Sequence, residues 1–386
     1  MKKKNSQLLP VVKRAVSQSR RDIADWRNAV TAARRADNPR FYQLQDIYQI
    51  ITDDALLASQ INNRHEPTVA HPFELVAGDG KVDDKLTAQL CSIPCFTDII
   101  KEILNSELYG YSVLELASPD NFTVINRRNF DPENGLFFPD ATSDKSVAYR
   151  RLNEYGRWIL EFYSGGNGLL NKCVPHTLFK RFAQSCWSEL CEIYGIPPRY
   201  VKTNTQDPEM LNRAQQMLQQ MGAAAAFVID TTEEFQFAQG VSTNGDVYNN
   251  LIRLCNNEIS LLISGAIMGQ DTANGNYSKE QASIGILNRL IASDQRMVEM
   301  YVNSIVLPAF MRLGWLPQKQ VAFRFAATED IAVLWQMVKD IIPYKDIDNK
   351  WLTEKFGLPV SDKFAAGDDN LSVFKKYLTA DSDFFA

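Results

Sequence analysis

Apolar residues recur at three- and four-residue spacing over several long stretches, which is the pattern of amphipathic helices. The predicted helices cover residues 43–63, 96–109, 177–194, 207–220, 246–268, 279–310 and 330–339, with a short one that ends at Gly357. In the helix 96–109, the apolar side carries Ile99, Ile100, Ile103, Leu104 and Leu108. Much of the chain is therefore predicted to be helical.

Between residues 112 and 163 the pattern changes to short segments rich in β-branched and aromatic residues, separated by Gly, Asn, Asp and Pro. This alternation is typical of a small antiparallel sheet, and a loop over residues 164–172 follows it. Further short strands are predicted at residues 74–77, 199–202, 226–229, 235–237 and 321–325. Helices and strands together favour an α+β fold.

The helices 177–194 and 246–268 have the broadest apolar faces. The first is ended by Gly195 and the following Pro197–Pro198 pair. The second is followed by the segment 269–278, which is polar and rich in turn formers, so an exposed loop is predicted there. The apolar face of the second helix is formed by Ile252, Cys255, Ile259, Leu262, Ile263 and Ala266.

The composition is that of a globular protein: 386 residues, of which 45% are hydrophobic and 23% charged. The longest uncharged apolar stretches, at 222–229 and 259–268, are shorter than the ~18–20 residues that cross a bilayer, so no membrane partner is expected. The basic N-terminus has an apolar run of only five residues, 8–12, which is too short for a secretory signal. The six scattered cysteines suit a reducing compartment. Synthesis in the cytosol is the prediction.

Charge is distributed unevenly along the chain. Residues 1–40 contain eleven Lys and Arg against three Asp and Glu, whereas the whole chain has a net charge of −5. Such a basic arm can bind a phosphate backbone. However, Val12, Val16, Ile23, Trp26 and Val30 recur near helical spacing, so a packed amphipathic helix is the favoured alternative. The acidic remainder argues against tight DNA binding, because it repels phosphates.

Motifs for catalysis or metal binding are scarce. The sequence has no P-loop, dinucleotide-binding turn, HExxH or GxSxG, and its three histidines are far apart, so no cofactor and no metal are predicted. A metal-dependent enzyme acting on nucleic acid remains as an alternative, with Asp230, Glu233 and Glu234 as possible ligands. Solvated acidic residues at turns are the simpler interpretation.

Three segments together resemble a known family. They are LYGYSVLEL at 108–116, LFKRFAQSCWSELCEIYGIPPRYVK at 178–202, and the helix–loop–helix at 257–294. The chain is similar, from about residue 46 to 359, to the Mu-type portal proteins of tailed bacteriophages, and it is shorter than typical members. The resemblance implies a ring, usually of twelve subunits, at one capsid vertex. Terminase drives DNA through this ring, and the tail connector docks onto it.

The resemblance also implies a division of the chain into parts. A basic arm (1–45) precedes the N-terminal part of the wing (46–176), which contains the small sheet. Two stem helices (177–195 and 238–268) flank a strand–helix–strand clip (196–237). A tunnel loop (269–278) leads to residues 279–386, the long wing helix with the C-terminal wing and a crown remnant.

Site residues follow from the same resemblance. The loop residues expected to contact double-stranded DNA, weakly and without sequence preference, are Gln270, Asp271, Thr272, Asn274, Asn276, Tyr277, Ser278 and Lys279. The expected clip and subunit contacts are Ile196, Pro197, Arg199, Tyr200, Lys202, Ala226 and Val228. The expected stem core is Phe179, Phe182, Trp187, Tyr194, Ile259 and Leu262. The run 222–230 could equally be a buried strand within one subunit.

The partners implied are further copies of the chain, the terminase large subunit, a head–tail connector, and the major capsid and scaffold proteins. The implied location is the portal vertex of the virion, after assembly in the cytoplasm of the bacterial host. A head–tail adaptor or scaffold-like protein without a DNA channel is the principal alternative, and a central hole in the assembly separates the two.

Overall fold

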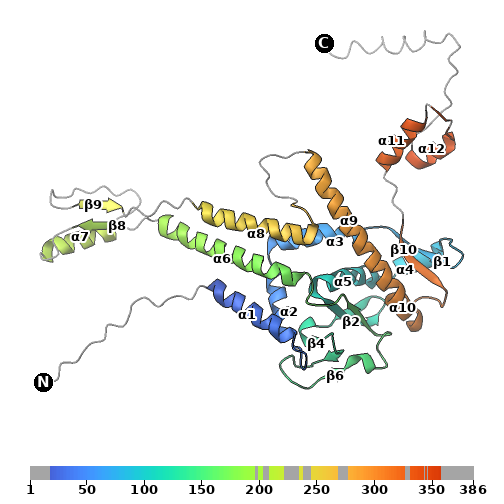
Figure 1. Ribbon diagram of the computed structural model, residues 1–386, viewed down its shortest axis with the longest axis horizontal. Coiled ribbons are helices and arrows are strands. Elements are labelled where there is room, and N and C mark those ends of the chain that lie inside the picture. The colour runs from blue at the N-terminus through green and yellow to red at the C-terminus, as the bar shows by residue number, and fades with distance from the viewer. Residues whose placement is uncertain are drawn as a thin grey trace, which may run out of the picture. The chain divides into compact units, whose positions relative to one another are not determined.

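The computed structural model describes residues 18–195, 199–202, 208–220, 234–237, 245–267, 277–326, 331–342, 344–345 and 347–357. The chain divides into two compact units, Met1–Ala326 and Ala327–Ala386. Figure 1 shows the helices and strands of both units. The predicted part 279–386 therefore spans the boundary between them.

The first unit combines long helices with small sheets. Its helices are α1 (Gln18–Ala33), α2 (Tyr42–Ile51), α3 (Ala55–Val69), α4 (Asp84–Cys91), α5 (Cys95–Tyr109), α6 (Leu170–Gly195), α7 (Pro208–Gln220), α8 (Asp246–Ser264), α9 (Tyr277–Tyr301) and α10 (Leu307–Leu313). Its strands are β1 (Phe73–Ala77), β2 (Tyr111–Ser118), β3 (Asn121–Val124), β4 (Phe130–Asp131), β5 (Leu136–Phe137), β6 (Val147–Ala148), β7 (Ile159–Tyr163), β8 (Arg199–Lys202), β9 (Glu234–Phe237) and β10 (Val321–Phe325). The predicted α+β class is confirmed.

Helix α5 is buried along the side that its sequence pattern predicts. Its five predicted apolar residues are all at most 2% exposed. Most of them join the hydrophobic core that α5 forms with α9, α10 and β10, where the rings of Phe96, Phe310 and Phe323 pack edge to face. Gly110, in the left-handed conformation (φ 92°), ends the helix.

The strands between residues 111 and 163 form two antiparallel sheets rather than the single one predicted. One has the order β3-β2-β7 and the other β4-β5-β6. A 3₁₀ turn at Arg127–Asn129 separates β3 from β4, and the Asn126 side chain accepts a hydrogen bond from the backbone of Arg128. β1 pairs with the distant β10, with Phe73 opposite Phe325, which local patterns could not reveal.

The N-terminal helices pack against the long helix α6 to form a second core. Ile23, Trp26 and Val30 of α1 are partly buried there, and Trp26 Nε1 donates a hydrogen bond of 2.9 Å to Asn171 Oδ1. The packed-helix interpretation of the basic arm is confirmed for α1. Val12 and Val16 lie outside the described residues.

The predicted continuous helix over residues 43–63 is wrong. It consists of α2 and α3, which are separated at Asp54. The Asp54 carboxylate accepts hydrogen bonds from the backbone amides of Leu56 (3.1 Å) and Leu57 (3.0 Å). An aspartate in this position satisfies amides that the first turn leaves unpaired, so a new helix starts here.

Helix α6 starts at Leu170, earlier than predicted, so the loop expected over residues 164–172 is shorter. The sequence contains Pro175, which cannot donate a backbone hydrogen bond and usually ends a helix. Leu170, Cys173 and Val174 are fully buried, however. We infer that burial of this first turn outweighs the missing hydrogen bond.

Helices α8 to α10 also differ from their predicted limits. α8 ends at Ser264 rather than at 268, because Gly265 adopts a left-handed conformation (φ 71°). α9 starts at Tyr277, two residues early. It continues through a π-helical turn at Val302–Val306 into α10, which ends at Gly314. The wider π turn accommodates Pro308 near the start of α10, so the proline does not end the helix.

Part of the predicted clip is described. β8 and β9 form an antiparallel pair with Arg199 opposite Phe237 and Lys202 opposite Glu234. α7 begins at Pro208, where a proline is compatible with the first helical turn. The strand predicted at 226–229 lies outside the described residues.

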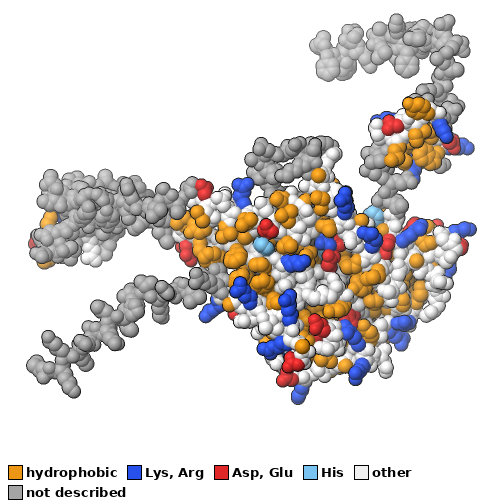
Figure 2. Space-filling view, in the orientation of Figure 1, with side chains coloured by type: hydrophobic (Ala, Val, Ile, Leu, Met, Phe, Trp, Pro, Cys, Tyr) orange, Lys and Arg blue, Asp and Glu red, His pale blue; other side chains and the backbone are white. Residues whose placement is uncertain are grey.

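The second unit contains two short helices, α11 (Ile331–Ile341) and α12 (Asn349–Phe356). The rings of Trp335 and Trp351 each contact Phe356 edge to face. Large apolar side chains remain exposed, Tyr344 the most at 85%, and orange side chains are visible on the surface of this unit in Figure 2.

Candidate functional site

Helices α6 and α8 lie side by side and form the candidate site (Figure 1). The glycine that precedes α8, Gly245, has φ 75° and lies against the indole of Trp187 in α6. A methyl group at Gly245 would lie 3.2 Å from Trp187 Nε1, which is tighter than an ordinary contact, and the left-handed φ also favours glycine here. The contact joins the C-terminal half of α6 to the start of α8.

Helix α6 is also fixed to the α2–α3 region by two cations. Lys180 Nζ lies 2.8 Å from Oδ2 of Asp54, and both side chains are less than 10% exposed. The Arg181 guanidinium donates a 2.9 Å hydrogen bond to the carbonyl of Ile50. Because Asp54 also caps α3, one carboxylate connects α3 with α6.

Helix α8 has three distinct faces. Its buried face contains Cys255, Ile259, Ser260, Ile263 and Ser264. A second, exposed surface is polar and carries Asn249 and Arg253, one turn apart in the N-terminal half of the helix. The third face has an exposed apolar row in which residues recur every seven positions. This apolar row is Val247 (69% exposed), Leu254 (55%) and Leu261 (45%).

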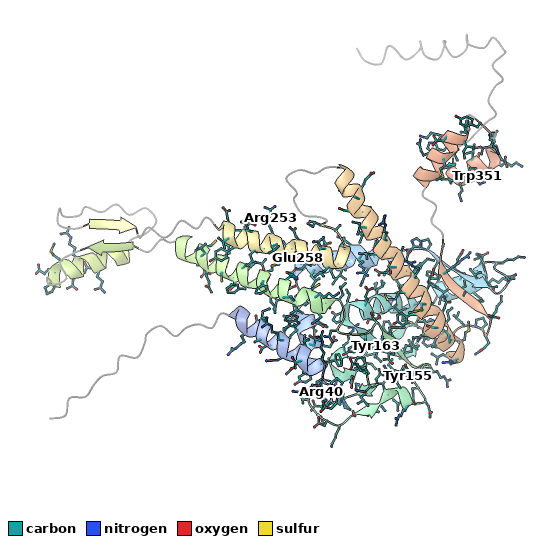
Figure 3. All side chains as sticks on the ribbon, in the orientation of Figure 1. Arg40, Tyr155, Tyr163, Arg253, Glu258 and Trp351 are labelled. Carbon is teal, nitrogen blue, oxygen red and sulfur yellow. The ribbon has the colours of Figure 1, made fainter. Side chains whose placement is uncertain are left out.

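The apolar row was not predicted as a feature of its own. Its seven-residue spacing is visible in the sequence and is the signal that could have revealed it. Exposed rows of large apolar side chains mark interaction surfaces more often than isolated ones do. Figure 2 shows hydrophobic side chains gathered over the α6–α8 hairpin, and Figure 3 labels Arg253 and Glu258 on α8.

The predicted stem-core residues differ in their burial. Ile259 is fully buried, whereas Phe182, Trp187 and Leu262 are half-buried. Phe179 is 41% exposed, so it is not a core residue of the single chain. The apolar face of α6 is broader than the surface that the rest of this chain covers. For Tyr194, only the backbone at the end of α6 is described.

The structure describes little of the predicted DNA-contacting loop. Gln270, Asp271, Thr272, Asn274 and Asn276 lie outside the described residues. The backbones of Tyr277, Ser278 and Lys279 form the first turn of α9 rather than the end of the loop.

The predicted clip contacts are likewise only partly placed. The backbones of Arg199, Tyr200 and Lys202 form β8. Ile196, Pro197, Ala226 and Val228 lie outside the described residues. So do two of the possible metal ligands, Asp230 and Glu233, while the third, Glu234, begins β9.

A buried arginine connects four helices next to the end of α8. In α3, Arg64 Nε and Nη2 donate hydrogen bonds of 2.8 and 2.7 Å to the carboxylate of Asp294 in α9. Nη2 also donates to both oxygens of Glu107 in α5, and Nη1 donates to the carbonyl of Ile263 in α8 at 3.3 Å. Beside it, Gln60 accepts a 2.6 Å hydrogen bond from Ser264.

The protonation equilibria of this cluster reflect burial and charge. Burial lowers the pKa of Arg64, but its hydrogen bonds and the charges of Asp294 and Glu107 outweigh this effect and raise it above the ordinary value. Burial raises the pKa of Asp294, although the Arg64 guanidinium acts in the opposite direction. The arginine therefore stays charged and its carboxylate partners compensate it.

The pKa of His65, the residue after Arg64, predicts that the stability of the protein depends on pH. Burial, with a contribution from the charge of Arg64, lowers the pKa of His65 from 6.5 to about 4. The unfolded chain therefore binds a proton more tightly, so stability is complete above about pH 6.5 and falls as the pH decreases towards 4. The loss by pH 4 is about 3 kcal/mol.

Urea unfolding of the wild type and of His65→Gln between pH 7.5 and 4.5 checks this value. The carboxylates titrate in both proteins, so the difference between the two curves of unfolding free energy against pH gives the contribution of His65. We expect the wild type to lose more stability than the variant over this interval. Parallel curves would contradict the assignment.

Neither a metal-binding cluster nor a membrane-spanning helix is found among the described residues. Within the ranges given above, no group of three or more His, Cys, Asp and Glu side chains is arranged to hold a metal ion. None of the helices in the same ranges has the length and apolar character needed to cross a membrane.

Comparison with known proteins defines the family. Residues 45–358 match the family described as "Portal protein of Mu bacteriophage". The chain belongs to this family of phage portal proteins. No curated protein matches the sequence.

Solved structures show the same fold. A chain from the "Neck of empty GTA particle computed with C6 symmetry" has a TM-score of 0.55 and 15% identity, and one from the "Virion of native gene transfer agent (GTA) particle" has 0.55 and 12%. Both matches cover 88% of this chain and 100% of the other. An HK97 family phage portal protein from Corynebacterium diphtheriae matches with a TM-score of 0.43 and 10% identity, covering 74% of this chain and 95% of that one.

Proposed function

We propose that this portal protein forms a ring, of twelve subunits, that serves as the DNA channel at one vertex of a phage or prophage capsid. Double-stranded DNA enters through the ring during packaging and leaves through it during ejection. The ring has a structural role in this process and no catalytic one. The observation that carries the proposal is the combination of portal family membership with the three faces of α8.

The apolar row supports ring formation. Contacts that close a ring of identical subunits are heterologous, so each subunit needs two different complementary surfaces. Val247, Leu254 and Leu261 give one such surface, because exposed apolar side chains are unfavourable in water and the described part of the chain leaves these three uncovered. Phe179, exposed on the neighbouring helix α6, is a candidate for the complementary surface of the next subunit.

The polar face supports a channel that does not retain DNA. Each lysine or arginine that pairs with phosphate strengthens binding and must be released as DNA moves. Asn249 is uncharged, and Arg253 is the one cation that each subunit contributes to this described surface. If this face lines the channel, contact with DNA is weak and independent of sequence.

The remaining predicted parts complete the proposal. Residues 269–276 form the tunnel loop around the DNA, with Gln270 and Asn274 among its contacts, and Lys279 contacts DNA from the first turn of α9. Residues 196–237, which include the β8–β9 pair and α7, form the clip that contacts neighbouring subunits. The helices and sheets of residues 46–176 and the region after 279 form the wing.

The proposed partners are the terminase large subunit, a head–tail connector, and the major capsid and scaffold proteins. The proposed location is the portal vertex of the virion, after assembly in the cytoplasm of a bacterial host. The solved GTA neck and virion chains, which have the same fold, support a place in a particle of this kind.

The subunit number in solution tests the proposal. The mass of the purified full chain, measured by mass photometry over a range of salt concentrations, is expected to be twelve times the 43.7 kDa of one chain. A species of one subunit at all concentrations would contradict ring formation. An assembly without a central hole in electron micrographs would favour the adaptor alternative.

A further inference from the structure

Helices α8 and α9 are joined by the segment 265–276, but they are held in place mainly through a third helix, α3. Both helices pack against α3, whereas they make little direct contact with each other. One direct contact is at Gly265, where a methyl group would lie 2.7 Å from Cγ2 of Ile286 and 3.2 Å from Cδ1 of Leu290. The separation of α8 from α9 therefore depends on how each of them packs against α3.

Arg64 of α3 donates hydrogen bonds to both α8 and α9. Its Nη1 donates to the carbonyl of Ile263, which lies in the last turn of α8, where carbonyls have no partner within the helix. Its Nε and Nη2 donate to the two oxygens of Asp294 in α9. The planar guanidinium fixes the directions of these hydrogen bonds.

Electrostatics favour this arrangement. The C-terminal end of α8 carries partial negative charge, which a cation stabilises. Asp294 and Glu107 supply further negative charge, and Arg64 and Asp294 are 5% and 2% exposed. Because burial makes each unpaired charge costly, Arg64 and its carboxylates must remain together.

We propose that Arg64 is a positioning residue that holds the end of α8 and the middle of α9 at a fixed separation. It thereby fixes the places at which the chain leaves α8 and enters α9. This inference rests on the proposed function, in which the segment between α8 and α9 surrounds the DNA. The width of the opening would then depend on a residue that does not contact DNA.

Arg64→Lys is the test variant, studied in the full chain. Lysine retains the positive charge that the buried carboxylates need, but one ammonium cannot bond Ile263, Asp294 and Glu107 in the same geometry. We expect amide hydrogen exchange at residues 259–267 and 280–290 to become about tenfold faster or more, because local opening costs less. Exchange in the sheet β3-β2-β7, to which Arg64 donates no hydrogen bond, should not change.

Arg127→Lys is the matched control. Arg127 also bonds a carboxylate, that of Glu102, and it donates to the hydroxyl of Ser112 and the carbonyl of Tyr111. The same substitution there should leave exchange in α8 and α9 unchanged. If Arg64→Lys does not fold, Asp294→Asn replaces it, since asparagine keeps one acceptor for Arg64.

Unchanged exchange at both ends of the segment would overturn the proposal. A uniform increase throughout the first unit would also overturn it, because this would show a general stabilising role. Subunit number, measured on the same samples, separates this result from the proposed function. A wild type that forms no rings contradicts the portal channel, while exchange still reports on the Arg64 contacts.

Discussion

Replacing Gly168 with alanine is expected to destabilise the protein by at least about 3 kcal/mol. Gly168 lies between β7 and α6 and has φ 73°. A methyl group there would lie 2.3 Å from the carbonyl oxygen of Leu108 and 2.5 Å from the amide nitrogen of Gly110. These are backbone atoms at the end of α5, so they cannot move without disturbing the core.

Gly166→Ala provides the control. Gly166 also has a positive φ, 62°, but a methyl group there meets no atom within 4 Å. The free energy of unfolding of this variant should fall by only about 1 kcal/mol, which is what the left-handed conformation costs an alanine. Urea unfolding of both variants measures the difference. Equal losses would show that the close approach of Gly168 to the end of α5 does not add to the cost of the substitution.

Leu254→Asp is expected to abolish ring assembly while leaving the subunit folded. Leu254 is 55% exposed in the single chain, so an aspartate there remains hydrated and affects folding little. In the proposed interface, the variant loses about 1.5 kcal/mol of apolar burial per contact, or about tenfold in association. It also places an unpaired carboxylate in an apolar contact, which costs more.

Asn249→Asp is the matched control, because it adds the same charge to the polar surface of α8, away from the apolar row. This variant should still form rings. Mass photometry measures assembly in both variants, and circular dichroism verifies that each remains folded. Rings of normal size from Leu254→Asp would show that the apolar row is not a subunit contact.

Local patterns predicted much of the fold because the relevant interactions lie close together in the sequence. The apolar side of α5 and the core residues Cys255, Ile259 and Ile263 of α8 follow helical spacing, and all are buried. Errors occurred where a distant contact or a special conformation decided the outcome. The start of α6 depends on burial of Leu170, and the end of α8 depends on the left-handed Gly265.

The candidate site was less predictable for the same reason. Arg64, Asp294 and Glu107 belong to three helices far apart in the sequence, and only the tertiary fold brings them together. The apolar row of α8 was visible in the spacing of Val247, Leu254 and Leu261, but its exposure was not. A sequence pattern shows which side chains share a face, whereas the fold determines which faces remain uncovered.

The most direct test of the portal channel is a cryo-electron microscopy reconstruction of the assembled full chain. The reconstruction should show a closed ring with a central opening as wide as duplex DNA. Asn249 and Arg253 should face this opening, and Leu254 should contact the adjacent subunit. A ring in which the apolar row faces the opening, or an assembly with no opening, would contradict the account.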